Sequence, residues 1–411
     1  MRRSIGTRFT VFWLICILLL AGCPSKPSRT PSQPAERPIL EPVPPERLPD
    51  FHDDEPAASL RSAIDKSLSW YAAVPGDSIV SLGDKSVPAW VIRDSLEHFA
   101  ALSGSGFIDK DRLLQEFDVF RVVPPDNSGR MLVTGYYEPV LDGSLKPEGE
   151  YRWPVYPVPP DLLVIELDRF DGNKFHGERL VGRLEKNFVV PYYSRSEIDG
   201  KKVLEKNGPE RKPTPPLAWL RDPVDCFFLH IQGSGVIRLN HGGPLMRVGY
   251  AGANGRPYHS IGKDLIESGA ISPEEMSLQA IRDYLRAHPE IQDRIMWKNG
   301  SYVFFKWISR GPVGSLAVEL TAGRSIATDP GFHPRGAPAF LVSEKPVYDS
   351  SGKILRWERF GRWVLNQDTG GAIKGPGRID LFCGTGEAAE KIAGPMKQQG
   401  ELYYLIKKGL I

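Results

Sequence analysis

The sequence is short of the features that mark several common classes of protein. Its 411 residues include only 4 cysteines, no Cys-x-x-Cys pair and no histidine pair at ligand spacing, so we expect no metal site and no bound cofactor. Lysine and arginine number 52 against 50 acidic residues, which leaves no basic surplus for binding nucleic acid. No apolar run reaches the about 20 residues that a membrane-spanning helix needs.

The first residues are nevertheless apolar, and they are typical of a secretory signal. Three arginines precede the run Phe9–Leu20, which ends in the small residues Ala21 and Gly22 before Cys23. This ending resembles a bacterial lipoprotein signal, in which residues 1–22 are removed and Cys23 is lipidated. The alternative is an ordinary cleaved signal followed by an incidental cysteine.

The residues after Cys23 indicate where such an anchor would place the protein. Pro24 follows Cys23 where an aspartate would favour the inner membrane, so resemblance to lipoprotein sorting rules favours the periplasmic face of the outer membrane. Residues 23–56 contain ten prolines and few apolar groups, which predicts a semi-rigid tether. At about 3.1 Å per residue this tether would reach roughly 100 Å.

Two further cysteines remain in the part that we expect to fold. Cys226 and Cys383 each lie in an apolar, strand-like run. In an oxidising periplasm they would be able to pair, and two buried free thiols are an equally good interpretation.

The folding part runs from about Ala57 to Ile411 and is long enough for two domains. Apolar residues recur at helical spacing over residues 60–71, 92–99 and 109–120. Ser272 and Glu275 form a capping-box pattern that predicts a further helix over 273–285. Short strand signals are expected at residues 131–140, 227–239, 245–252, 302–305, 316–320, 339–342, 363–365 and 379–382. Many short strands at near-regular spacing favour a small β-barrel.

The stretch Asn366–Gly384 carries the strongest chemical signal. Asp368 and Asp380 bracket a run with four glycines, and a fifth, Gly384, lies just beyond; this pattern predicts a strand, a tight loop and a second strand, with both carboxylates at the loop edges. A third acid, Asp329, lies upstream in Ala-Thr-Asp-Pro-Gly. The three acids either perform acid chemistry or cap turns, and residue type and spacing alone leave both interpretations open.

Three functions compete at this point. A glycan-cleaving enzyme would use one aspartate as an acid, and aromatic residues such as Tyr136 and Tyr137 would suit sugar faces. An aspartic protease would use Asp368-Thr369-Gly370, but that chemistry needs two such aspartates and no second copy of the tripeptide exists. A non-catalytic module that binds the cell wall explains the aromatics but gives no reason for acids around a glycine loop.

Four longer motifs resemble the membrane-bound lytic murein transglycosylase A family. They are Gly135-Tyr-Tyr-Glu-Pro139, His230-Ile-Gln-Gly-Ser-Gly235, Ala322-Gly-Arg-Ser-Ile-Ala-Thr-Asp-Pro330 and Gln367-Asp-Thr-Gly-Gly-Ala-Ile-Lys-Gly375. They occur in the family's order, and the resemblance extends from about Ser59 to Ala393. It implies a double-psi β-barrel formed by residues 57–129 and 300–411, with a three-aspartate region at about 310–384. A second β domain, residues 130–299, would be inserted into it, with a substrate groove between the two.

The resemblance also implies an activity and the residues that carry it. The family cleaves the β-1,4 bond between N-acetylmuramic acid and N-acetylglucosamine in peptidoglycan and leaves a 1,6-anhydro product. Its catalytic acid matches Asp380, and its two supporting acids match Asp368 and Asp329. Substrate contacts are expected from Tyr136, Tyr137, Gln232, Gly233, Ser234, Lys374 and Gly375. The partner would be the glycan strand, and a peptidoglycan-binding lipoprotein without activity remains the alternative.

Overall fold

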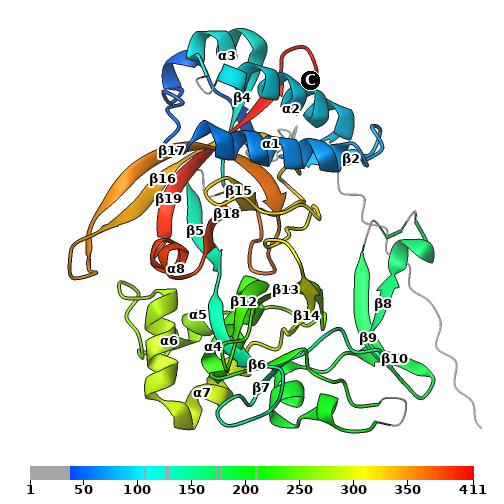
Figure 1. Ribbon diagram of the computed structural model, residues 1–411. Coiled ribbons are helices and arrows are strands. Elements are labelled where there is room, and N and C mark those ends of the chain that lie inside the picture. Colours follow the sequence, from blue (N-terminus) through cyan, green and yellow to red (C-terminus); the bar gives the residue numbers. More distant parts are fainter. Residues whose placement is uncertain (1–37, 106–107, 126–128, 173, 176–177, 209–211) are drawn as a thin grey trace, which may run out of the picture. The chain divides into compact units, whose positions relative to one another are not determined.

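The computed structural model describes residues 38–105, 108–125, 129–172, 174–175, 178–208 and 212–411. Both the predicted signal and the lipidated Cys23 lie outside these residues. The described chain is mainly β, with helices packed around two groups of strands (Figure 1). None of the helices in these ranges combines the length and the apolar character that crossing a bilayer requires.

The first group of strands comes from both ends of the chain and closes into a barrel. Its neighbours run in the order β19, β16, β17, β15, β18 and β5, and β5 pairs again with β19, so six strands form a ring. β4 and β1 extend this sheet from β19, and β2 and β3 form a separate hairpin. The strands are β1 (Leu40–Pro42), β2 (Ile79–Leu82), β3 (Lys85–Pro88), β4 (Phe117–Val122), β5 (Met131–Glu138), β15 (Ser325–Ala327), β16 (Pro338–Tyr348), β17 (Ile354–Asp368), β18 (Arg378–Thr385) and β19 (Lys397–Lys407). The helices are α1 (Ala57–Tyr71), α2 (Ala89–Leu102), α3 (Lys110–Glu116) and α8 (Glu387–Ala393). The closed ring confirms the predicted barrel.

The second group is inserted between β5 and β15. Its main sheet has the order β14, β13, β12, β6, β11 and β7, and a smaller sheet has the order β10, β9 and β8. The strands are β6 (Val140–Ser144), β7 (Trp153–Val155), β8 (Leu163–Glu166), β9 (Arg179–Glu185), β10 (Phe188–Pro191), β11 (Ala218–Leu220), β12 (Ser234–Leu239), β13 (Leu245–Ala253) and β14 (Val303–Ile308). The helices are α4 (Pro223–Gln232), α5 (Ile261–Glu267), α6 (Leu278–Ala287) and α7 (Pro289–Met296).

Strand pairing crosses both expected limits of this insert. β5 begins at Met131, inside the predicted insert, but it pairs with β18 and β19 of the barrel. β14 runs to Ile308, beyond the predicted limit of 299, and pairs with β13 of the insert. By sheet membership, β5 goes with the barrel and β14 with the insert, and the limits of 130 and 299 stay predictions.

A helix occupies most of the first half of the predicted strand at 227–239. Asp222 caps this helix, α4, by accepting a hydrogen bond from the backbone N–H of Val224, and Pro223 takes its first position. The strand expectation was wrong here because α4 is buried on nearly every side, so its sequence lacks the polar face that marks a surface helix. Gly233, with φ of 79°, ends the helix, and β12 follows at once.

Three other element predictions were wrong. The Ser272–Glu275 hydrogen bonds form, at 3.0 and 3.3 Å, but they close a turn, and helix α6 starts later with Ser277 as its cap. Residues 117–120 belong to strand β4 rather than to a helix, because they pair with β19 in the barrel sheet. The run at 316–320 is a loop held by a single bridge between Val313 and Glu319.

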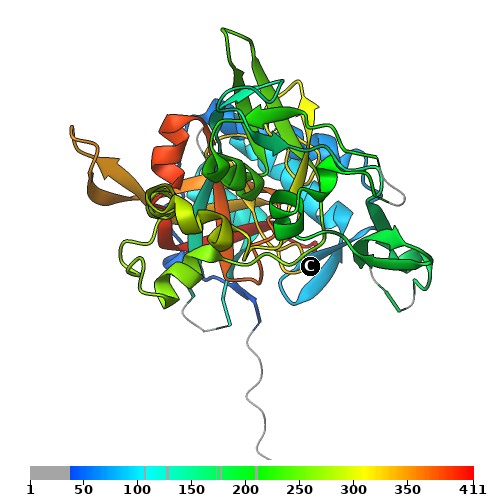
Figure 2. The same ribbon diagram turned by 90° about the horizontal axis from the view of Figure 1, so that it is seen from below.

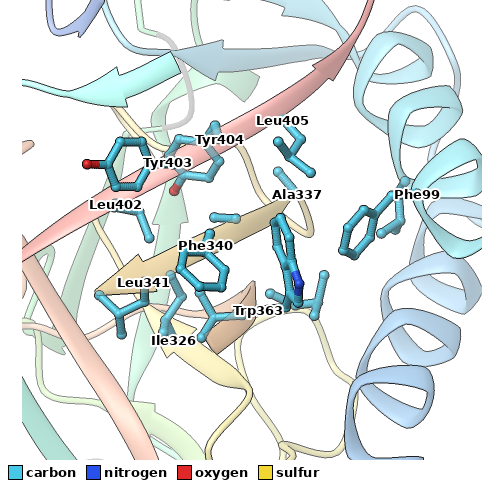
Figure 3. Packing of buried hydrophobic residues seen from close by; sticks show 14 of the residues in the cluster. Phe99, Ile326, Ala337, Phe340, Leu341, Trp363, Leu402, Tyr403, Tyr404 and Leu405 are labelled. Atoms are coloured by element: carbon cyan, nitrogen blue, oxygen red, sulfur yellow. The ribbon is translucent and has the colours of Figure 1, made fainter. Parts of the chain in front are cut away.

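The barrel core is organised around Trp363 on β17 (Figure 3). Its ring contacts Phe340 on β16 and Phe99 on α2, each with a centroid distance of 4.8 Å. Phe51, from the residues before α1, stacks on the same ring at 5.3 Å. Burying such aromatic rings removes a large apolar area from water, so this cluster joins helix, barrel and N-terminal segment in one core.

The last part of the predicted tether is not free. Residues 38–56 pack on the barrel: β1 pairs with β4, and Phe51 is buried. Asp53 forms two hydrogen bonds with the fully buried Arg324, at 2.8 and 2.9 Å, and Asp54 binds Arg362 in the same way. The tether expectation was wrong for these residues. Their acids bind buried arginines and their apolar side chains enter the core, and a count of prolines does not predict either contact.

The hairpin of β16 and β17 is longer than the barrel needs. β19 pairs only with residues 339–342 of β16, and β15 pairs only with residues 365–368 of β17. Within the described part of the chain, residues 343–364 therefore have no third strand beside them. Both views show this part, coloured orange, projecting from the barrel (Figures 1 and 2). Of the two interpretations left open for the cysteines, the structure shows free thiols, Cys226 in the insert and Cys383 in β18.

We predict that Asp53→Asn destabilises the protein through Arg324. The variant leaves a buried guanidinium without its counter-charge, which costs about 3 kcal/mol of unfolding free energy. Urea unfolding at neutral pH measures this loss. Asp50→Asn, at an exposed site in the same segment, is the matched control and should stay within about 0.5 kcal/mol of the wild type. Equal stability of both variants would contradict a role for this segment in the fold.

Candidate active site

Strand pairing brings Asp368 and Asp380 to one face of the barrel sheet. Ala327 in β15 pairs with Asp368 on one side and with Asp380 on the other, and Asp380 pairs with Thr134 in β5. Residues opposed in neighbouring strands point to the same face, so these polar side chains share one surface. Two strand spacings, about 10 Å, separate the backbones of the two acids.

The glycine-rich loop at residues 369–377 connects the two strands that carry these acids. Asp368 ends β17, as predicted, whereas Asp380 is the third residue of β18 and lies within the strand rather than at the loop edge. Gly375 adopts a φ of 79°, and a Cβ on Gly370 would lie 2.8 Å from the side chain of Ile373. Only glycine allows this loop at both positions.

Asp380 is an isolated carboxyl group in a desolvated position. Its Oδ1 accepts a hydrogen bond of 2.8 Å from the hydroxyl of Thr134, and it forms no ion pair within the described residues. Its pKa is raised to about 7, chiefly by burial and to a lesser extent by the charge of Asp368, while the Thr134 hydrogen bond and the charge of Arg378 act in the opposite direction. At neutral pH this group therefore exchanges a proton readily.

Asp368 has a different environment, since three donors hold its carboxylate. The hydroxyl of Tyr136 donates to Oδ2 at 2.9 Å, and the backbone N–H groups of Ser315 and Thr369 donate to Oδ1 at 2.9 and 2.8 Å. Burial raises the pKa of Asp368, while these hydrogen bonds favour its ionised form. The geometry excludes a protease dyad, because the two acids lie two strands apart and share no proton.

Asp329 is the third acid, and it shapes the loop. Its Oδ2 accepts from the N–H of Gly375 at 2.8 Å, and its Oδ1 accepts from the N–H of Gly331 at 3.0 Å. The first of these bonds ties the glycine loop to the end of β15. Asp329 thus caps turns, which is the structural alternative that the sequence had left open for it.

A cleft of about 510 Å³ opens beside Asp380. Barrel and insert both contribute to its wall. The barrel side includes Thr134, Tyr136, Gly370, Ile373, Arg378, Asp380 and Lys397, and the insert side includes Arg195, Phe228, His230, Gln232, Tyr258, Lys263, Met276 and Asn299. A volume of this size accommodates sugar rings, and its mixed apolar and polar lining suits them.

The structure brings only some of the predicted residues to this cleft. Tyr136, Gln232 and Asp380 line it. The others, including the two supporting acids, are absent from its lining: Tyr137, Gly233, Ser234, Asp329, Asp368, Lys374 and Gly375.

Tyr137 shows why strand alternation matters here. Its side chain is 1% exposed and packs on Ala389 and Ala393 of α8, so the expectation that it stacks on a sugar was wrong. Successive residues of a strand point to opposite faces, and Tyr136 therefore takes the cleft side. The side-chain oxygen of Gln232 accepts from the backbone N–H of Tyr137 at 3.0 Å, which fixes the end of α4 to β5.

Several cleft residues escaped the sequence reasoning. Thr134 lies beside Asp380 through strand register, Arg378 precedes Asp380 by two residues in β18, and Tyr258 enters from a loop of the insert. Thr134 directly precedes the Gly-Tyr-Tyr motif, and this position was the one sequence feature that pointed to it. Nothing in the local sequence marks Tyr258.

A buried pair, Arg195 and His230, supports the insert wall. Nη1 of Arg195 lies 2.9 Å from Nδ1 of His230, and its other nitrogens donate to the carbonyls of Asn299 and Ser301. Arginine only donates, so His230 must accept at Nδ1 and is neutral. Burial and the Arg195 charge lower the pKa of His230 well below its usual value, which agrees with that state.

Charged contacts join the insert to the barrel behind the cleft. Glu138, the last residue of β5, is fully buried and accepts from Thr385 of β18 at 2.7 Å and from Arg247 of β13 at 3.2 Å. Arg282 of α6 binds Glu390 of α8 at 2.7 Å. These contacts fix the two walls against each other.

Comparisons with known proteins agree with this geometry. Residues 132–306 match the family model described as the MltA specific insert domain, and residues 324–406 match the 3D domain. The membrane-bound lytic murein transglycosylase A of Escherichia coli (strain K12) is 34% identical over 290 residues, which cover 70% of this chain and 69% of that protein.

Solved structures show the same similarity over most of the chain. A membrane-bound lytic murein transglycosylase from Agrobacterium tumefaciens has a TM-score of 0.72 at 30% identity, covering 90% of this chain and 98% of that one. Escherichia coli MltA with bound chitohexaose has a TM-score of 0.65 at 26% identity, covering 90% and 95%.

We predict that two substitutions move the pKa of Asp380 in opposite directions from its value of about 7. Asp368→Asn removes a neighbouring negative charge and should lower it, whereas Thr134→Val removes a hydrogen bond to the ionised form and should raise it. Carbon NMR titration of labelled aspartate carboxyls measures both shifts. Shifts of the same sign in the two variants would contradict the described environment.

Proposed function

The chain belongs to the membrane-bound lytic murein transglycosylase A family, and we propose that Asp380 is the single acid and base with which it cleaves peptidoglycan. The observation that carries this proposal is a carboxyl group in the cleft wall with a pKa of about 7 and no cationic partner bound to it among the described residues. General acid–base groups work best when their pKa lies near the working pH.

The reaction needs no water. In the first step Asp380 gives its proton to the oxygen that bridges C1 of N-acetylmuramic acid and C4 of N-acetylglucosamine. The C1–O bond breaks, its electron pair stays with the departing oxygen, and positive charge develops at C1 as in glycosidases. In the second step the Asp380 carboxylate takes the proton from the C6 hydroxyl, whose oxygen bonds to C1. The products are a 1,6-anhydromuramic end and a free C4 hydroxyl, and Asp380 is protonated again.

The neighbouring groups serve this cycle without touching the reacting atoms. The fixed negative charge of Asp368 makes Asp380 hold its proton more tightly, so it favours the acid form before each turnover. Tyr136, whose hydroxyl is held by Asp368, presents its ring to the cleft, and Gln232 forms part of the opposite wall. We assign sugar contacts to these two residues and a role in loop structure to Asp329.

The other candidate functions are less well supported. A module that only binds the cell wall gains nothing from a carboxyl group with a raised pKa, because burying it costs stability. The protease needs a second aspartate within hydrogen-bond reach of the first, and the described residues offer Asp368 only backbone and tyrosine partners.

Attachment to the outer membrane is part of the same proposal. The family is membrane-bound, and the sequence Leu-Ala-Gly-Cys at residues 20–23 would supply a lipid anchor at Cys23. Residues 38–56 pack on the barrel, so any tether between the anchor and the folded part ends before them.

We predict that Asp380→Asn abolishes product formation while binding survives. The amide has nearly the same shape but transfers no proton, and because one group serves both steps, the loss should reach or exceed the about 10⁴-fold upper range for general acid–base catalysis. Mass spectrometry of anhydro-ended fragments from purified murein measures the rate. Asp77→Asn, at an exposed site away from the cleft lining, is the control and should retain full activity. Anhydro products formed by Asp380→Asn at close to the wild-type rate would refute the assignment.

We predict that Cys23→Ala releases active enzyme from the membrane fraction. The variant lacks the residue that would carry lipid, while the folded part is untouched. Cys16→Ala, inside the apolar run of the signal, is the matched control and should leave the protein attached. Fractionation followed by an activity assay measures both. Membrane retention of Cys23→Ala would count against the anchor.

A further inference from the structure

The cleft carries an excess of positive charge that neutral sugars do not require. Four basic side chains and one acid are found among its lining residues: Arg195, Lys263, Arg378 and Lys397 against Asp380. A glycan strand without charged groups would gain nothing from these basic side chains. We therefore looked for a negatively charged group on the substrate that they would bind.

Three of these four cations already have partners. Arg195 lies 3.6 Å from Asp199 and donates to His230 and two carbonyls. Lys263 pairs with Glu267 at 3.7 Å on the outer side of α5. Lys397 donates to the carbonyl oxygen of Pro273 at 2.8 Å.

Arg378 differs from the other three. Within the described part of the chain it forms no ion pair and no side-chain hydrogen bond, and its Nε is buried without an acceptor. An arginine nitrogen that has lost water and gained no acceptor carries a desolvation cost. Nε itself is closed to solvent, whereas the two terminal nitrogens of Arg378 are not among the buried atoms, and these are the donors that a ligand in the cleft can reach.

The position of Arg378 ties it to the reaction. It precedes Asp380 by two residues in β18, so the two side chains point to the same face of the strand. Its charge lowers the pKa of Asp380 and so disfavours the protonated form that the acid needs for the first step. A binding role for Arg378 offsets this cost, since an anion bound to it would cancel the charge.

We propose that Arg378 binds a carboxylate carried by the lactyl arm of the muramic residue whose bond is cleaved. The proposal rests on the transglycosylase function given above. That muramic residue carries a lactyl ether at C3, on the same ring whose C1 reacts beside Asp380. The arm ends in its own carboxylate when no peptide is attached, and otherwise the first free carboxylate belongs to the stem peptide. Guanidinium matches either one with two parallel hydrogen bonds.

The consequence is a preference for muramyl substrates over neutral chitin-type oligosaccharides of equal length. Both share the N-acetyl sugar backbone, but only muramyl chains bear the carboxylate. Arg378 would therefore act as a specificity residue, while Asp380 performs the chemistry.

The test compares Arg378→Gln with the wild type on three ligands. These are chitohexaose, peptide-free glycan strands with free lactyl carboxylates, and strands that keep their stem peptides. We expect KM to rise about tenfold or more for at least one of the two muramyl substrates, as for a lost charge-assisted hydrogen bond. The Kd for chitohexaose should change less than twofold. Arg378→Lys should lose less affinity than Arg378→Gln, because lysine keeps the positive charge but cannot form the two parallel hydrogen bonds of a guanidinium.

The two muramyl substrates identify the carboxylate. A loss confined to peptide-free strands assigns the lactyl group, and a loss confined to peptide-bearing strands assigns the stem. A loss on both assigns whichever carboxylate is present.

Two results would overturn the proposal: an unchanged KM on both muramyl substrates, or an equal loss for chitohexaose. Retained chitohexaose binding shows that the variant is folded, and Arg356→Gln, an exposed arginine on the β16–β17 hairpin, controls for loss of one positive charge. If the wild type itself forms no anhydro product, the proposed function fails independently of Arg378.

Discussion

A carboxyl group that has been withdrawn from water holds its proton to higher pH, and Asp380 is kept in that state by the strands around it. β5 and β15 flank β18 and supply the Thr134 hydroxyl and the small Ala327 beside the acid. A cation bound directly to Asp380 would have stabilised its ionised form and removed its ability to donate. The barrel instead supplies one neutral donor and, two strands away, the negative charge of Asp368.

This arrangement separates two tasks that often fall to two acids. Asp368 is held by three hydrogen bonds that favour its ionised form, whereas Asp380 has a single hydrogen bond and a pKa of about 7. The insert supplies the opposite wall of the cleft. Its position depends on buried polar contacts, of which Glu138 is the clearest, because it joins strands of both domains. The chemistry therefore depends on interactions some distance from the acid.

The sequence allowed the barrel and the importance of the glycine run to be predicted, because strand periodicity and glycine content are local properties. Resemblance to the family motifs added two further predictions, an inserted domain and Asp380 as the catalytic acid. Strand register was not predictable, since it depends on pairing between residues more than two hundred positions apart, such as Thr134 and Asp380. For that reason Thr134 was missed and Tyr137 was misplaced, whereas Arg378 was missed although it lies only two residues before Asp380. The packing of residues 38–56 was not predicted either. Their proline content indicated a tether, and nothing in the local sequence shows that their acids bind Arg324 and Arg362.

The central claim is that one carboxyl group acts as acid and then as base, so that the C6 hydroxyl rather than water closes on C1. Digestion of murein by the wild-type protein in water enriched in heavy oxygen tests this most directly, with mass spectrometry of the new muramic ends. The account predicts ends that lack one water and contain no heavy oxygen. New ends that carry heavy oxygen from the solvent would show hydrolysis and would contradict it.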